Sequence, residues 1–299
     1  MELANYTFAG FIMTYERSEI LEATIRDVFL QTVPPEKLLI VDNSASSKTE
    51  ALLLQLNDSR VCYHKVGYNA GPAGAAAIGL QLLAHEGYDW IYWGDDDDPP
   101  LFKDTFEILL KVALSDVRCG CVGAVGNYFS NLTGFVTRAT NKALNHEGIL
   151  EVDTIAGGMT KIVSGPMILK HNILPEEKLF FGFEELDFDL KVKNKGYKLL
   201  VDKELFWKHR VHANRVDYKR NYLEKKNASL LWRNYYSVRN LLFICFKNHL
   251  YSALLIHFTK ALFKPFYNLR YGLAYFRKSF IVNYLGTYHF FIGRLGKNC

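Results

Sequence analysis

The first hundred residues of this 299-residue chain alternate short apolar segments with amphipathic ones. The apolar segments have the length and composition of buried strands and cover residues 7–13, 37–41, 61–65 and 90–93. Between them, apolar side chains recur at helical spacing through residues 20–29, 52–56 and 71–84. This alternation predicts an α/β fold, with a mostly parallel sheet covered by helices on both faces. Such sheets bind ligands at the carboxyl ends of their strands.

The charge is divided unevenly along the chain. Residues 203–299 contain 18 basic and three acidic side chains, a net charge of +15, whereas residues 1–202 carry a net charge of −10. An acidic first part suits a divalent cation, and a basic, apolar second part suits an anionic membrane surface or a phosphate-bearing acceptor. The apolar residues among these basic side chains favour lipid over nucleic acid as the partner.

The cysteines and the N-terminus predict a cytoplasmic protein. The five cysteines are odd in number and lack the spacing of a zinc site or a disulfide framework, so reduced thiols are expected. Glu2 stands where a signal peptide would have Lys or Arg, and no long apolar run follows it.

An acidic run follows the fourth predicted strand directly. Four adjacent carboxylates, Asp95 to Asp98, repel one another unless a cation neutralises them, and hard cations such as Mg²⁺ or Mn²⁺ prefer oxygen ligands that they share with substrate phosphates. In an extended segment, alternate residues point to the same side, so Asp95 and Asp97 are predicted to act together while Asp96 faces elsewhere. The alternatives are a solvated acidic turn and a Ca²⁺ loop in a non-catalytic glycan-binding module.

An ordered set of motifs resembles the family-2 glycosyltransferases of the GT-A fold, in particular the bacterial rhamnosyl- and galactofuranosyltransferase branches. The resemblance covers residues 7–212 and is more specific than any single motif. Its motifs are Thr14-Tyr15-Glu16-Arg17, Val41-Asp42-Asn43-Ser44, Tyr68-Asn69-Ala70-Gly71-Pro72-Ala73-Gly74, the acidic run, Phe181-Gly182-Phe183-Glu184-Glu185-Leu186-Asp187, Gly196-Tyr197 and His209. It implies a GT-A sheet domain followed by a C-terminal helical extension.

The resemblance implies roles for individual residues in binding the sugar donor and the metal. The residues expected to contact the donor nucleotide are Thr14, Arg17, Asp42, Asn69, Gly74, Asp95 and Asp96. Asp97, with Asp95, is expected to hold Mn²⁺ or Mg²⁺, and His209 is the expected third ligand, with His212 as its competitor. Simpler interpretations remain for Gly74 as a packing position and for Asp42 as a helix cap.

The acid-rich segment around residue 185 supplies the predicted catalytic base. An inverting enzyme needs one carboxylate to take the proton of the acceptor hydroxyl, and Glu185 is the first candidate, with Glu184 as the alternative. Asp187 is either an acceptor contact or a helix cap. Trp93 is a weaker candidate for stacking on a sugar, and Arg233, with Arg239, for binding the diphosphate of a lipid-linked acceptor.

The chain is predicted to divide near Arg215, into a catalytic domain of residues 1–215 and a helical region of residues 216–299. Lys247 and Lys260 interrupt every apolar run that approaches membrane-spanning length, so an interfacial amphipathic helix is expected. Its predicted apolar face carries Leu250, Leu254, Phe258 and Leu262, and its polar face His257, Lys260 and Lys264. The alternatives are a packed helical bundle and a surface that forms a homo-oligomer.

Together these features predict a metal-dependent inverting glycosyltransferase at the inner face of the cell membrane. The resemblance implies a UDP- or dTDP-linked sugar of the rhamnose, galactose or galactofuranose class as the donor. A glycan, free or linked to polyprenyl diphosphate, is the expected acceptor in surface polysaccharide or O-antigen synthesis. A dinucleotide-dependent oxidoreductase is disfavoured because the first strand is not followed by G-x-G-x-x-G.

Overall fold

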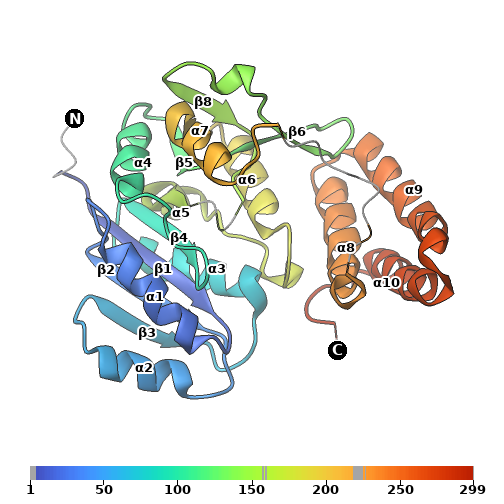
Figure 1. Ribbon diagram of the computed structural model, residues 1–299, viewed down its shortest axis with the longest axis horizontal. Coiled ribbons are helices and arrows are strands. Elements are labelled where there is room, and N and C mark those ends of the chain that lie inside the picture. The colour runs from blue at the N-terminus through green and yellow to red at the C-terminus, as the bar shows by residue number, and fades with distance from the viewer. Residues whose placement is uncertain (1–4, 157, 159, 218–224, 226, 299) are drawn as a thin grey trace.

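The computed structural model describes residues 5–156, 158, 160–217, 225 and 227–298 (Figure 1). An eight-stranded sheet forms the centre of the larger part, with strand order β3-β2-β1-β4-β9-β5-β10-β8. Strands β6 and β7 form a separate two-stranded ribbon. The strands are β1 (Phe8–Thr14), β2 (Lys37–Asp42), β3 (Val61–Lys65), β4 (Trp90–Asp95), β5 (Cys119–Gly123), β6 (Asn127–Phe129), β7 (Val136–Arg138), β8 (Ile149–Val152), β9 (Lys161–Ser164) and β10 (Lys198–Asp202).

The predicted α/β fold class is confirmed. Strands β1 to β4 pair in parallel, as do β5 and β10, while β9 runs antiparallel between β4 and β5 and β8 runs antiparallel on the edge. The helices are α1 (Ser18–Phe29), α2 (Lys48–Leu56), α3 (Gly71–His85), α4 (Thr105–Ala113), α5 (Gly165–His171), α6 (Glu184–Asn194), α7 (Lys203–His212), α8 (Trp232–Lys247), α9 (Tyr251–Tyr267) and α10 (Leu273–Phe291).

Side chains of each central strand alternate between two cores. Phe11 and Met13 of β1 pack with α3, α5 and α6 on one face, whereas Phe8 and Ile12 pack with α1 and α4 on the other. Helix α3 lies close to the sheet, since a Cβ on Gly79 would meet the Phe11 ring at 2.4 Å. Because both faces are covered, the strands are apolar throughout, and the polar residues gather where the strands end.

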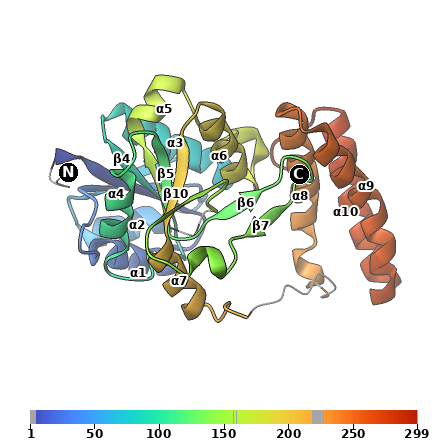
Figure 2. The same ribbon diagram turned by 90° about the horizontal axis from the view of Figure 1, so that it is seen from above.

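Helices α8, α9 and α10 form a unit beside the sheet domain. Both views place α8 nearer to the sheet, with α9 and α10 side by side on the outside (Figures 1 and 2). The predicted domain boundary near Arg215 falls between α7 and α8, next to residues 218–224 and 226, which lie outside the described residues, so the division stays a prediction. None of the helices in the described ranges is both long and apolar enough to cross a membrane.

Candidate active site

The sheet brings the ends of β1, β2 and β4 side by side. Thr14 pairs with Asp42 across β1 and β2, and Met13 pairs with Asp95 across β1 and β4. Three of the motifs recognised in the sequence therefore meet at one edge of the sheet, the carboxyl edge at which open α/β sheets bind ligands.

Asp96 is held by the first of these motifs. Its carboxylate accepts hydrogen bonds from Thr14 Oγ1 at 2.8 Å and from Arg17 Nη1 at 3.1 Å, and the same Arg17 nitrogen lies 2.5 Å from Asp97 Oδ2. Asp96 raises the pKa of Arg17, with Asp97 adding to the effect, so this guanidinium stays charged. Thr24 of α1 also holds the turn at Asp96 and Asp97, because its Oγ1 donates a hydrogen bond to the Asp96 carbonyl at 2.7 Å.

Asp42 is fully buried and both of its carboxylate oxygens are engaged. The amide of Ser44 donates to Oδ1 at 2.8 Å, and Tyr63 Oη donates to Oδ2 at 3.0 Å. Burial and this contact raise the pKa of Tyr63 well above its usual range, so the phenol stays a donor. Asp42 therefore fixes the loop after β2.

The segment before α3 is packed against the loop that precedes α6. Asn69 Oδ1 accepts from the amide of Gly71 at 2.9 Å, and the amide of Ala73 donates to the carbonyl of Phe180 at 3.3 Å. Gly71 has φ = +71°, and a Cβ there would lie 2.2 Å from the Phe180 oxygen. A Cβ on Gly74 would lie 2.6 Å from that of Ala70. Gly71 thus permits the close approach of two backbone segments, and Gly74 leaves room for the side chain of Ala70 one turn earlier.

Three carboxylates, Asp95, Glu184 and Glu185, form a cluster between β4 and the start of α6. Burial raises the pKa of Asp95 to about 7, with Glu185 as the largest charged contributor. Burial, followed by the charge of Glu185, raises the pKa of Glu184 well above its usual range, and Glu184 Oε2 has no hydrogen-bond partner within the described part of the chain. Glu184 is 5% exposed, whereas Glu185 is partly open to solvent. Of the two glutamates, Glu185 is the one a substrate can reach.

A cavity of about 280 Å³ opens at Asp98, three residues after Asp95. Asp98 lines it together with His209 and His212 of α7, and Arg138 and Arg215 line it as well. His209 Nε2 is buried and, among the residues described, has no hydrogen-bond partner. Burial lowers the pKa of His209 to about 4, so the imidazole is neutral and able to bind a metal ion. A carboxylate, a neutral imidazole and arginines on one cavity suit a complex of a divalent cation with a diphosphate.

The structure separates the predicted metal ligands from one another. Asp97 pairs with Arg17, and Asp95 lies beside the glutamates, while Asp98 is the acid that shares a cavity with His209. The alternation expected for an extended segment ends at Asp95, because the chain turns at Asp96 and Asp97. In the described ranges, no group of three or more His, Cys, Asp or Glu side chains is close enough to hold a metal ion.

Two weaker candidates for substrate contact are buried in structural roles. Trp93 is 1% exposed and packs on Phe11 and Phe188, so the expected sugar stacking is wrong. Asp187 is also 1% exposed and pairs with Lys191 at 2.5 Å and with Lys247 of α8 at 3.5 Å. Instead of contacting an acceptor, it links α6 to the C-terminal helices.

The arginines of α8 also differ from one another. Arg233 is exposed, and its guanidinium lies 5.6 Å from the Phe181 ring centroid, close to the glutamates. Arg239 is fully buried and donates to the carbonyls of Leu179 and Gly296, which corrects its expected contact with an acceptor diphosphate.

Residues 179–183, which we call the glutamate loop, are fastened by one side chain of α8. Asn240 Nδ2 lies 3.0, 3.0 and 2.9 Å from the carbonyl oxygens of Leu179, Phe181 and Gly182, respectively. The loop needs this support because Phe180 and Phe183 have positive φ angles of 64° and 70°. The C-terminal helices therefore set the position of Glu184 and Glu185.

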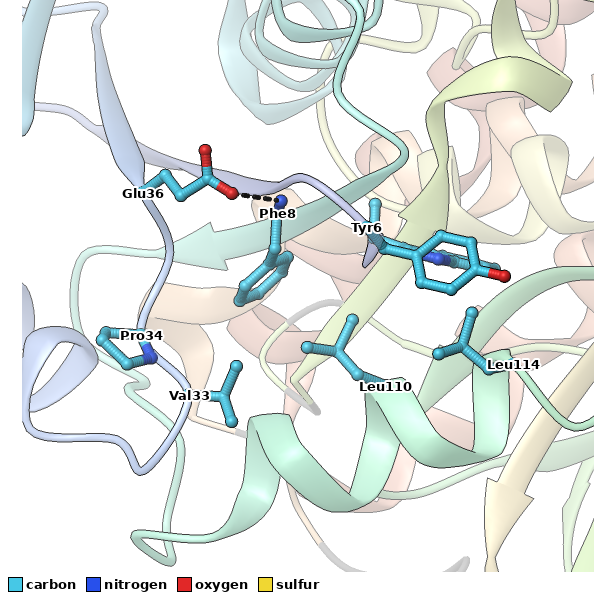
Figure 3. A pocket seen from close by; sticks show the side chains of 8 residues that line it. Tyr6, Phe8, Val33, Pro34, Glu36, Leu110 and Leu114 are labelled. Carbon is cyan, nitrogen blue, oxygen red and sulfur yellow. Dashed lines mark hydrogen bonds between the residues drawn. The ribbon is translucent and has the colours of Figure 1, made fainter. Parts of the chain in front are cut away.

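A second cavity lies at the opposite end of the strands (Figure 3). Phe8 and Trp90, at the starts of β1 and β4, line it with Val33 and Leu110, and Glu36 accepts a hydrogen bond from the amide of Phe8. It is remote from the carboxyl edge, and the side chains that line it are mostly apolar.

Sequence reasoning missed three residues of this region. The predicted metal ligands were Asp95 and Asp97 and did not include Asp98, although the alternation of side chains along an extended segment places Asp98 on the same side as Asp96. Glu16 ties the loops after β1 and β2 together by accepting from the amides of Ala45 and Ser46. Asn240 acts on a loop about 60 residues away along the chain, and no local pattern signals such a contact.

Comparison with known proteins agrees with this fold and identifies the family. The model of the family "Glycosyl transferase family 2" matches residues 11–167, more than half of the chain, so the chain belongs to that family. A curated relative, the galactofuranosyltransferase GlfT1 of Mycolicibacterium smegmatis, is 22% identical over 196 residues, which cover 62% of this chain and 65% of the relative. The chain thus spans slightly less than two thirds of that protein's length.

Solved structures share the GT-A fold at low identity. GalNAc-T7 with UDP, GalNAc and Mn²⁺ superposes with a TM-score of 0.53 at 15% identity, covering 66% of this chain and 42% of that one. The mannosyltransferase PcManGT from Pyrobaculum calidifontis, in complex with GDP-Man and Mn²⁺, superposes with a TM-score of 0.56 at 11% identity. That match covers 97% of this chain and 88% of the other, so it includes the C-terminal helices. The predicted fold and family are therefore confirmed.

Proposed function

We propose that this protein is an inverting glycosyltransferase that moves a sugar from a nucleoside diphosphate to an acceptor hydroxyl. The observation that carries the proposal is the placement of a partly exposed glutamate, Glu185, beside Asp95, whose carboxyl also senses the charge of Asp98 on the wall of the cavity that holds His209. Both solved structures named above hold nucleotides and Mn²⁺, and the curated relative is named as a galactofuranosyltransferase.

The donor would lie along the ends of β1, β2 and β4. In the proposal, Thr14, Arg17 and Asp96 border the nucleotide, with Asp42 and Asn69 shaping the two loops beside it. The start of α3, which packs at Gly71 against Phe180, is proposed to lie near the diphosphate. A UDP- or dTDP-linked sugar of the rhamnose, galactose or galactofuranose class is the proposed donor.

Asp98 and His209 would hold the divalent cation, Mn²⁺ or Mg²⁺, with the donor phosphates completing its coordination shell. When bound, the cation neutralises charge that develops on the leaving diphosphate. Arg138 and Arg215, on the same cavity, add positive charge at the diphosphate.

Glu185 acts as the general base in this proposal. The acceptor oxygen attacks the anomeric carbon, its proton passes to the Glu185 carboxylate, and the bond from the anomeric carbon to the phosphate oxygen breaks with the electron pair leaving on the nucleoside diphosphate. Glu184 is buried, and burial together with the charges of Glu185 and Asp95 raises its pKa, so it helps to shape the carboxylate cluster. The proposed acceptor is a glycan, free or carried on a polyprenyl diphosphate, in surface polysaccharide synthesis at the inner face of the cell membrane.

Nucleotide calorimetry tests the donor site. UDP and dTDP are titrated into the protein with Mn²⁺ and again with excess chelator, using wild type, Asp98→Asn and the control Asp116→Asn on the far side of the sheet. We expect one nucleotide to bind only with the metal, and Asp98→Asn to weaken it by about tenfold or more. Tight Ca²⁺ binding without nucleotide binding would instead support a non-catalytic glycan-binding module.

A further inference from the structure

Helix α10 packs on the neighbouring C-terminal helices partly through polar and small residues. On α10, the residues that face the other helices are polar or small: Ser279 and Asn283 are fully buried, and Thr287 is 6% exposed. A Cβ on Gly286 would lie 2.7 Å from the Tyr235 carbonyl oxygen, so α10 and α8 approach closely at this glycine. Small and polar residues between helices are typical of helices whose outward faces contact lipid.

The outward sides of α9 and α10 are apolar. Six large side chains there are between 52% and 76% exposed, and we call them the outer face: Leu255, Phe263, Phe266, Leu273, Ile281 and Phe291. They recur within one helical stripe on each helix. The two helices lie side by side away from the sheet domain (Figure 2), joined by contacts of Phe258 with Phe291 and of Phe266 with Phe276 and Phe280.

The structure follows the amphipathic pattern predicted for residues 250–265 only in part. Of the predicted polar face, Lys260 is exposed, whereas His257 is 9% exposed and contacts the carbonyl oxygen of Gly134 at 3.1 Å. Leu254, Phe258 and Leu262 are partly buried, and the more exposed positions are Leu255, Phe263 and Phe266. The predicted apolar face therefore packs inward, as the alternative of a packed helical bundle expected, and the helix carries further large apolar side chains outside it.

The basic residues around the outer face favour an anionic membrane over a second copy of the chain as its partner. Residues 225–299 contain 12 Lys and Arg and no Asp or Glu. Arg277 and Lys278 are exposed on α10, beside Leu273 and Ile281. Basic side chains around exposed aromatic and aliphatic residues complement an anionic bilayer surface. A second copy would bring another surface without acids against this one, which electrostatic repulsion disfavours.

We infer that the outer face of α9 and α10 docks into the interfacial layer of an anionic membrane without crossing it. The inference deepens the proposed function and rests on it for the acceptor, since a lipid-linked sugar presents its hydroxyl at such a surface. Helix α8 then joins the membrane-bound helices to the site, because its Asn240 and Arg239 hold the glutamate loop.

Vesicle co-sedimentation of the full chain tests the docking. The wild type is compared with the triple variant Phe263→Glu, Leu273→Glu, Phe291→Glu and with the control Leu54→Glu, which alters an equally exposed leucine on α2. Vesicles contain phosphatidylcholine alone or with phosphatidylglycerol. We expect the wild type and the control to bind the anionic vesicles, and the triple variant to bind them at least about tenfold more weakly. Binding should also weaken at high salt.

Unchanged vesicle binding by the triple variant, or no binding by the wild type, would overturn the inference. Light scattering tests whether a second copy of the chain covers the outer face instead. If the wild type is a dimer that does not bind vesicles and the triple variant is a monomer, the outer face is a dimer interface. Nucleotide titration of each variant keeps the two proposals separate. Vesicle binding without nucleotide binding would contradict the proposed function but not the membrane docking. Nucleotide binding without vesicle binding would contradict the membrane docking but not the proposed function.

Discussion

Replacing Asn240 by Ala should slow sugar transfer without weakening nucleotide binding. Among the described residues, the substitution removes the hydrogen-bond donor to the carbonyl oxygens of Phe181 and Gly182, whereas the carbonyl of Leu179 keeps Arg239 and the amide of Phe181. Leaving such groups unpaired costs about 1–3 kcal/mol. If the free energy of holding the glutamate loop against α8 changes by about 2 kcal/mol, the ratio of held to released loop changes by roughly thirtyfold.

The assay is kcat for transfer from the sugar nucleotide, measured beside the nucleotide Kd and the melting temperature. We expect kcat to fall about tenfold or more, because the loop leads directly into Glu184 and Glu185. The Kd should stay within about a factor of two of wild type, because the contact of the loop with the segment before α3 is made by the Phe180 carbonyl, which Asn240 does not touch. Ser237→Ala, on the same helix, removes a hydrogen bond to the Arg233 carbonyl and serves as the control. Wild-type kcat in Asn240→Ala would refute the role of α8, and parallel losses in kcat and nucleotide affinity would indicate general unfolding instead.

Three further substitutions test other parts of the structure. Gly71→Ala should weaken nucleotide binding more than Gly87→Ala, since both positions have positive φ but only Gly71 would place a Cβ against Phe180; equal effects in calorimetry would contradict this. Lys161→Met should lower the free energy of unfolding in urea by about 3–5 kcal/mol, because it leaves Asp189 buried without its partner at 2.5 Å, and a loss below about 1 kcal/mol would show the charge to be solvated. Burial lowers the pKa of His209 to about 4, below its value in the unfolded chain, so the free energy of unfolding of the metal-free protein should fall as the pH drops from about 6.5 towards 4. His209→Gln should lose less of this free energy over the same range. Identical pH profiles of the two proteins would contradict the buried, neutral state of His209.

The arrangement of the sheet domain followed from local patterns in the sequence. Strand and helix periodicity located β1 to β4 with their helices, because each element buries a face whose spacing is visible in the sequence. Parallel strands also bring their polar ends to one edge, so the meeting of Thr14, Asp42 and Asp95 was predictable.

Other features depend on contacts that no local pattern contains. The turn at Asp96 and Asp97 is fixed by Thr14, Arg17 and Thr24, and it redirected Asp98 to the cavity in place of Asp95 and Asp97. The buried state of Trp93 reflects how completely α6 covers the sheet. The helical pattern of residues 250–265 also does not show that His257 packs against Gly134.

The most direct test of the proposed function is transfer of sugar to an acceptor, followed by mass spectrometry, with a panel of UDP- and dTDP-sugars. Wild type and Glu185→Gln are compared, with Glu204→Gln, an exposed glutamate on α7, as the control. We expect one donor to support transfer by the wild type and the control, and Glu185→Gln to bind the same nucleotide but turn over at least about a hundredfold more slowly. Wild-type turnover in Glu185→Gln would contradict the assignment of the base, and no transfer from any donor, with no nucleotide bound, would contradict the proposed function itself.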